Sequence, residues 1–312
     1  MPLGAIFPGQ GSQSVGMLSE LAAQYDTVRQ TFSEASEWLG YDLWRLVQEG
    51  PADALNATEN AQPAVLTAGI SLWRIWHEEG GAPPMLMAGH SLGEYTALAC
   101  AGVIDFADAV SLVAHRGRLM QEAVPAGHGA MAAIIGLGAR ELEELCQRLA
   151  EGEVVSCANF NAPGQVVIAG DKEAVGRVIA EAKALGASRV VLLPVSVPSH
   201  CALMAPAAER LAERLRGMRL CRPAIPVVHN VDALARNEPD GIADALAAQL
   251  SQPVRWVEVV RAMTRMGVDV LVELGPGSVL TALCRRIDRE LTCLPTGDPK
   301  KLETALSGQC KW

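Results

Sequence analysis

Two short apolar runs, separated by helical sequence, constrain the fold most strongly. Leu3–Phe7 and Met85–Ala88 are apolar throughout, which is typical of strands buried on both faces. Between them, residues 20–38 and 62–79 have the spacing of amphipathic helices. Parallel neighbours need long connections of this kind, because the chain must return to the same end of the sheet. The sequence therefore predicts an α/β domain with a parallel sheet, and further strands are expected at 224–231 and 268–274.

The middle of the chain has a different pattern. It predicts, in order, strand 130–137, helix 139–150, strand 154–159, strand 165–169, helix 171–185 and strand 189–195. This order is that of the ferredoxin-like α+β unit. We therefore predict a small ferredoxin-like subdomain at 126–195, inserted into a discontinuous large α/β domain formed by 1–125 and 196–312.

Composition excludes several classes of protein. Half of the 312 residues are hydrophobic, as in globular proteins, and the net charge of −9 disfavours nucleic-acid binding, which needs a basic surface. The eight cysteines form no CxxC or cysteine–histidine spacing, so neither a zinc site nor a disulfide framework is expected. No apolar stretch is long enough to cross a bilayer and no basic signal sequence begins the chain, so we expect a cytoplasmic protein without membrane contact.

The sharpest chemical motif is Gly89-His90-Ser91-Leu92-Gly93, between a predicted strand and a helical pattern that begins at Glu94. A G-x-S-x-G sequence in this context exposes a serine hydroxyl on a sharp turn, beside the N–H groups of the next helix. Such a serine can act as a nucleophile, and the N–H groups can stabilise an oxyanion. The alternative is an ordinary glycine-rich turn.

A nucleophilic serine needs a base, and a substrate needs an anchor. His200 follows a predicted strand and lies in a loop, where α/β proteins place reactive groups. Arg116, in a predicted helix, can be a clamp for a substrate carboxylate. For both residues the alternative is a solvated side chain without a role in chemistry.

Seven motifs, in order along nearly the whole chain, resemble the malonyl-CoA:acyl carrier protein transacylases of fatty acid synthesis and, more distantly, the acyltransferase domains of polyketide synthases. They are Phe7–Gln13, Gly89–Glu94, Arg116-Gly117 with Met120-Gln121, Asn161–Gln165, Pro198–His200, Gln249 with Pro253–Trp256, and Glu273–Gly277. The resemblance implies a serine-hydrolase-like large domain, the ferredoxin-like insertion and an active site in the groove between them. It also implies transfer of malonyl from malonyl-CoA to the phosphopantetheine thiol of acyl carrier protein, through a malonyl-serine intermediate.

The resemblance also assigns roles to individual residues. It makes Ser91 the nucleophile, His200 its base and Arg116 the anchor of the malonyl carboxylate. The backbone N–H groups of Gln10 and Leu92 would form the oxyanion hole.

Three further residues would support this site. The main-chain carbonyl of Gln249 would orient the histidine, while Asn161 and Met131 would line the pocket. Ser199 matches the polyketide relatives that take methylmalonyl, but freestanding fatty-acid enzymes share the Pro-Ser-His sequence, so malonyl is expected. No metal and no organic cofactor is implied.

The implied partner, an acyl carrier protein, is typically acidic. Because this chain is also acidic, attraction needs a local basic cluster, and Arg285 and Arg286 with Arg289 form the densest one near Gly275–Gly277. The alternative is a solvated helix face paired with neighbouring acidic residues. We expect the chain to act as a monomer.

Other functions would use part of the same site. A serine thioesterase or esterase would result if water reached the acyl-enzyme, and the usual hydrolase order then needs an acid between serine and histidine, such as Asp171. The transacylase component of malonate decarboxylase or of a polyketide pathway would share the chemistry. An inactive carrier-binding scaffold is the remaining alternative.

Overall fold

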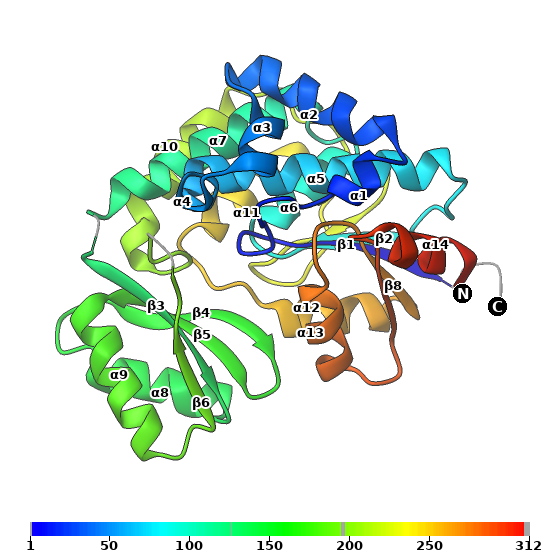
Figure 1. The fold of residues 1–312 in the computed structure, drawn as a ribbon. Helices are drawn as coiled ribbons and strands as arrows, with labels where there is room; N and C mark the ends of the chain where they lie inside the picture. The colour runs from blue at the N-terminus through cyan, green and yellow to red at the C-terminus, as the bar shows by residue number, and fades with distance from the viewer. Residues whose placement is uncertain (1, 126, 195–196, 309–312) are drawn as a thin grey trace.

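The computed structural model describes residues 2–125, 127–194 and 197–308, and a parallel five-stranded sheet lies at its centre (Figure 1). The strand order is β7 (Val227–Val228), β2 (Leu86–Gly89), β1 (Leu3–Phe7), β8 (Val270–Glu273) and β9 (Thr292–Pro295). All four pairings are parallel. The predicted α/β fold with a parallel sheet is therefore confirmed.

Helices cover both faces of this sheet, as alternating side chains of β1 require. Leu3, Ala5 and Phe7 belong to the larger core, whereas Ile6 belongs to a second core on the other side. The larger core is formed with α1 (Ser19–Ala22), α2 (Asp26–Leu39), α3 (Leu43–Glu49), α4 (Ala52–Asn56), α5 (Thr58–Glu78), α6 (Leu92–Cys100), α7 (Phe106–Ala123), α10 (Ala205–Arg216), α11 (Pro239–Gln249) and α14 (Pro299–Gly308). The second core is formed with α12 (Trp256–Arg265) and α13 (Val279–Ile287).

A separate antiparallel sheet forms the lower part of the molecule in Figure 1. Its elements are β3 (Gly129–Ile135), α8 (Ala139–Leu149), β4 (Val155–Ala162), β5 (Gln165–Asp171), α9 (Lys172–Ala184) and β6 (Arg189–Leu192). The strand order β4-β5-β3-β6, with apolar side chains of both helices packed on it, is that of the predicted ferredoxin-like unit. The predicted boundaries at 126 and 195–196 lie outside the described residues, so the division into domains stays a prediction.

Two elements differ from the sequence prediction. The helix predicted at 20–38 is divided into α1 and α2, because Tyr25 is extended (φ −126°) while its N–H still bonds to the carbonyl of Leu21. The strand predicted at 224–231 has only the two residues of β7. It ends there because His229 and Asn230 leave the sheet to form buried side-chain hydrogen bonds.

The seven cysteines in the described ranges are free thiols, and Cys310 lies outside those ranges. Within the same ranges, no helix combines the length and the apolar character that a membrane span requires.

Candidate active site

Ser91 lies at the point where β2 gives way to α6. Its backbone has φ +52° and ψ −110°, a conformation that non-glycine residues rarely adopt. Both flanking glycines are needed for this turn. A Cβ on Gly89 would lie 1.8 Å from the carbonyl carbon of Gly93, and one on Gly93 would lie 2.0 Å from the oxygen of Phe7. The G-x-S-x-G spacing thus lets β1, the turn and α6 meet at backbone contact.

His200 faces this serine, with its Nε2 atom 2.7 Å from Ser91 Oγ. The other ring nitrogen, Nδ1, lies 2.7 Å from the main-chain oxygen of Gln249. Because a carbonyl can only accept, Nδ1 carries the proton and Nε2 is left to accept from the serine hydroxyl. The geometry expected for the Gln249 carbonyl is therefore present.

Asp171, the acid that a hydrolase-type triad would need, is engaged elsewhere. Its Oδ2 accepts from the N–H of Val154, 2.8 Å away in the antiparallel sheet. The Nδ1–H of His200 is already bound to Gln249. Asp171 therefore does not orient the histidine.

The surroundings of His200 keep its imidazole neutral. Burial, followed by the positive charge of Arg116, lowers the pKa of His200 to about 3. At neutral pH the ring is thus unprotonated and able to accept a proton.

Arg116, on α7, is a buried cation with neutral partners. Its side chain is 1% exposed, and it donates to Gln62 Oε1 at 2.9 Å and to Gln249 Oε1 at 3.1 Å. The same guanidinium lies 3.4 Å from Ser91 Oγ and 5.1 Å from the centre of the Tyr95 ring. No ion pair is formed by Arg116 within the part of the chain that the structure describes, and its Nε has no hydrogen-bond partner there. A buried charge without a counter-charge is costly, so an anion that enters the cavity would be stabilised next to this guanidinium.

The two expected oxyanion donors come from two different segments of the large α/β part. Gln10 follows β1 and lines the cavity at Ser91, and Leu92 is the first residue of α6. Among the described residues, neither backbone N–H has a hydrogen-bond acceptor. N–H groups in a loop or in the first turn of a helix can be free in this way, because no helical hydrogen bond uses them. Their role in the reaction stays a prediction.

These groups open into one cavity of about 230 Å³ between the two sheets. The large α/β part contributes Gln10, Ser91, Arg116 and His200. The antiparallel part contributes Met131, Asn159, Asn161, Val167 and Leu193, and the start of α13 contributes Val279, Leu280 and Leu283. Asn161 Oδ1 lies 2.8 Å from Nε2 of His90, the residue before the serine. Both residues expected to line the pocket, Asn161 and Met131, thus do so.

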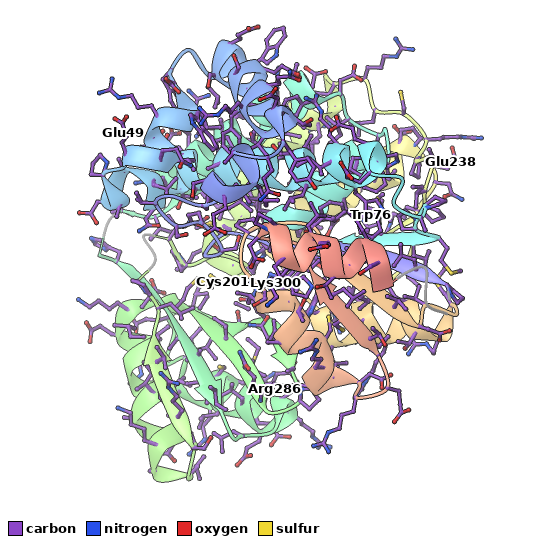
Figure 2. The ribbon with its side chains drawn as sticks, turned by 45° about the vertical axis from the view of Figure 1, so that its right-hand side comes forward. Glu49, Trp76, Cys201, Glu238, Arg286 and Lys300 are labelled. Carbon is purple, nitrogen blue, oxygen red and sulfur yellow. The ribbon has the colours of Figure 1, made fainter. Side chains whose placement is uncertain are left out.

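The expected docking residues lie outside this cavity, at the far end of α13. Arg285 and Arg286 are both exposed, and Arg285 donates to the carbonyl of Cys293 at 2.9 Å. Arg286 donates to Gln165 of the antiparallel sheet, so it lies between the two parts of the molecule (Figure 2). Neither arginine has an acidic partner among the described residues.

Sequence reasoning did not identify the buried polar groups behind the serine. Asn230 accepts from the N–H of Ser91 at 2.7 Å, and Glu94 accepts from the N–H of Asn230 at 2.9 Å. Gln62 is a further partner of Arg116. A signal for Asn230 exists, because it follows a strand of a parallel sheet at its carboxyl end, where functional groups gather.

Comparisons with known proteins show what this chain is similar to. Residues 5–297 match the family model described as acyl transferase domain. The chain is similar to the malonyl CoA-acyl carrier protein transacylase of Escherichia coli strain K12, with 57% identity over 301 residues, 96% of this chain and 97% of that protein.

Solved structures extend the likeness to the whole fold. An acyl carrier protein S-malonyltransferase from Vibrio cholerae has a TM-score of 0.95 at 55% identity, covering 97% of this chain and 99% of that chain. A malonyl-transacylase in complex with the acyl carrier protein of a type II polyketide synthase has a TM-score of 0.98 at 54% identity, covering 99% of this chain and 100% of that chain.

Proposed function

The chain belongs to the acyl transferase domain family and is an acyltransferase; on this premise, we propose that it transfers malonyl from malonyl-CoA to the phosphopantetheine thiol of an acyl carrier protein, as a step of fatty acid synthesis. The observation that carries the proposal is the meeting of three side chains in one cavity: Ser91, His200 and Arg116, which forms no ion pair with any described residue. The first two supply a nucleophile and its base. The third supplies an anchor for a carboxylate, which malonyl has and acetyl lacks.

The first half-reaction acylates the serine. His200 Nε2 takes the hydroxyl proton while Ser91 Oγ bonds to the thioester carbon, and the negative oxygen faces the N–H groups of Gln10 and Leu92. When the carbon–sulfur bond breaks, the departing thiolate takes the proton from His200. The products are coenzyme A and a malonyl-serine ester.

The second half-reaction reverses these roles. The carrier thiol gives its proton to His200 and bonds to the ester carbon. The carbon–oxygen bond of the ester then breaks, and Ser91 recovers the proton. The proton that leaves on coenzyme A is thus replaced by the one that the carrier thiol brings, and His200 ends each half-reaction neutral, so this chemistry needs neither metal nor organic cofactor.

Arg116 supports the choice of a carboxylated acyl group. A carboxylate that replaces the glutamine partners would convert a buried, unpaired cation into a charge-assisted pair. The pairing would also offset the positive charge that disfavours protonation of His200. Binding of malonyl would therefore both pair the charge of Arg116 and make it easier for His200 to take up a proton.

Two carriers fit the proposal. The bacterial relatives are named for an unspecified acyl carrier protein, whereas one similar structure holds the carrier of a type II polyketide synthase. A comparison of kcat/KM for purified carriers of both kinds, at the same ionic strength, assigns the pathway.

Intact-mass analysis tests the acylation. Wild-type protein mixed with malonyl-CoA alone should gain one malonyl group, and peptide mapping should place it on Ser91. Ser91→Ala should gain none. Label on the alanine variant, or on the neighbouring thiol of Cys201, would overturn the serine mechanism. Subsequent addition of carrier should remove the label faster than water does, and equal rates would instead indicate a thioesterase.

A further inference from the structure

The turn that carries the nucleophile is held from behind by one side chain. Asn230 Oδ1 accepts from the N–H of Ser91 at 2.7 Å, and Asn230 Nδ2 donates to the oxygen of Gly89 at 2.7 Å. The carboxamide thus joins the last residue of β2 to the serine, across His90. Asn230 itself is completely buried, and it comes from the chain that leaves β7.

Asn230 is in turn fixed by a buried carboxylate on the helix that the turn begins. Glu94 Oε2 accepts from the N–H of Asn230 at 2.9 Å, and Glu94 Oε1 lies 2.7 Å from Nδ1 of His229. Gln249 Nε2 donates to Glu94 at 2.9 Å and to the oxygen of Ser91 at 3.0 Å. Both sides of the serine backbone are therefore held: its N–H by Asn230 and its carbonyl by Gln249.

This arrangement has a consequence for the reaction. The carbonyl of Ser91 and the N–H of Leu92 belong to one planar peptide, so the bond that holds the first also sets the direction of the second. The N–H of Ser91 is occupied by Asn230, whereas the N–H of Leu92 has no hydrogen-bond acceptor in the part of the chain that the structure describes. The backbone at φ +52° is unfavourable for serine and persists only when its surroundings hold it.

We propose that Asn230 is a positioning residue for acyl transfer: its carboxamide holds the turn from Gly89 to Ser91, so that the serine hydroxyl faces His200 and the N–H of Leu92 faces the developing oxyanion. The inference rests on the proposed function, because it assumes that Ser91 is acylated. Asn230 acts only through the turn, since it does not line the cavity.

Pre-steady-state acylation by malonyl-CoA separates this role from a structural one. The burst amplitude counts folded, competent sites, whereas the burst rate constant reports the geometry within them. Asn230→Ala should lower the rate constant roughly 10- to 100-fold, as expected for a misplaced nucleophile, with little change in KM. Thr296→Val is the matched control, because it removes another buried side-chain bond to a backbone carbonyl, two strands away from β2. It should lower thermal stability and leave the rate constant unchanged.

Asn230→Asp adds a second readout, the pH dependence of the burst rate constant, which a loss of stability alone does not explain. This variant tests the positioning role even if Asn230→Ala does not fold. A protonated carboxyl has one donor and one acceptor, so it can replace both bonds of the amide. The charged and titratable groups around this position are Glu94, His229, His200 and Arg116. Burial and the Glu94 carboxylate should raise the pKa of the new carboxyl, so the burst rate constant should be near wild type at low pH and fall as pH rises.

The outcomes are distinct. If wild-type protein is not acylated, the proposed function fails. If wild type is acylated and Asn230→Ala reacts with the same rate constant per competent site, the positioning role alone fails. A pH-independent rate constant for Asn230→Asp, equal to that of wild type, would likewise overturn it.

Discussion

Gln249 is a single buried residue that contacts three residues of the candidate active site through three different atoms. Its main-chain oxygen orients His200, its Oε1 accepts from Arg116, and its Nε2 holds the carbonyl of Ser91. Ser91, His200 and Arg116 therefore share one partner. A change in the charge of Arg116 should therefore change the pKa of His200, because both groups are desolvated and close together.

Replacement of Arg116 first tests whether this residue binds the malonyl carboxylate. Arg116→Ala should lower kcat/KM for malonyl-CoA roughly 30- to 5000-fold, because the malonyl carboxylate would be buried without a partner. This loss corresponds to an activation free energy higher by about 2–5 kcal/mol. Acetyl-CoA has no carboxylate and should lose much less. An equal loss for the two thioesters would show that Arg116 serves the fold instead.

The same variant should change the pH profile. Burial and the charge of Arg116 both lower the pKa of His200, so loss of that charge should raise it. The base fails below its pKa, hence the acid limb of acetylation should move to higher pH in Arg116→Ala than in wild type. Rates measured from pH 3 upward, on protein shown to be folded, check the direction of the shift.

At the scale of elements, the turn that carries Ser91 depends on close contact between β1 and α6. Gly93 lies in the first turn of α6, where any Cβ would meet backbone atoms of Phe7 and Pro8 rather than flexible side chains. Backbone in the centre of a sheet cannot move aside cheaply. The second glycine of the motif is thus required for packing, independently of the reaction.

A pair of glycine substitutions separates packing from helix propensity. Gly93→Ala should reduce the free energy of unfolding by about 3 kcal/mol or more, because the new methyl group overlaps the oxygen of Phe7. Gly176→Ala, on the exposed face of α9 with open space around the Cβ position, should increase it by about 0.5–1 kcal/mol. Urea denaturation of both variants measures these changes. A Gly93→Ala protein as stable as wild type would contradict the close approach.

At the scale of the whole molecule, α13 links the cavity to the surface. Leu280 and Leu283 line the cavity, and Arg286 lies about 9 Å beyond Leu280 and about 4.5 Å beyond Leu283 along the helix axis, given a rise of about 1.5 Å per residue. Arg286 also contacts Gln165 of the antiparallel sheet (Figure 2). A carrier bound at this end of α13 would therefore lie at the junction of both parts and close to the cavity.

The basic pair should matter for the carrier and not for coenzyme A thioesters. Replacement of Arg285 and Arg286 together by alanine should raise KM for an acidic carrier and flatten its salt dependence, because exposed charges act mainly on encounter. Acylation of Ser91 by malonyl-CoA should change little. The matched control is the double alanine variant of Arg140 and Arg148, exposed arginines of α8 that pair with glutamates. Unchanged carrier kinetics at low salt would exclude the pair from docking.

Much of the fold could be predicted because its signals are local. The apolar runs of β1 and β2, the ferredoxin-like order and the G-x-S-x-G turn each depend on neighbours in the chain. The break between α1 and α2 was not predictable, because Leu21 and Val28 keep an amphipathic pattern across it and only packing interrupts the helix. The early end of β7 was not predictable either, because the bonds of His229 and Asn230 that end the strand are formed with residues far away in the sequence.

The sequence by itself determined which groups could react: a serine on a glycine-flanked turn, a loop histidine and a helical arginine. Only the tertiary structure decided that they meet, since Ser91 and His200 are 109 residues apart and Ser91 and Asn230 are 139 apart. It also decided that His200 is neutral, that Arg116 is buried with no ion pair to any described residue and that Asn230 bonds to the backbone of the serine. These properties depend on desolvation and on distances across the chain, and residue type alone specifies neither.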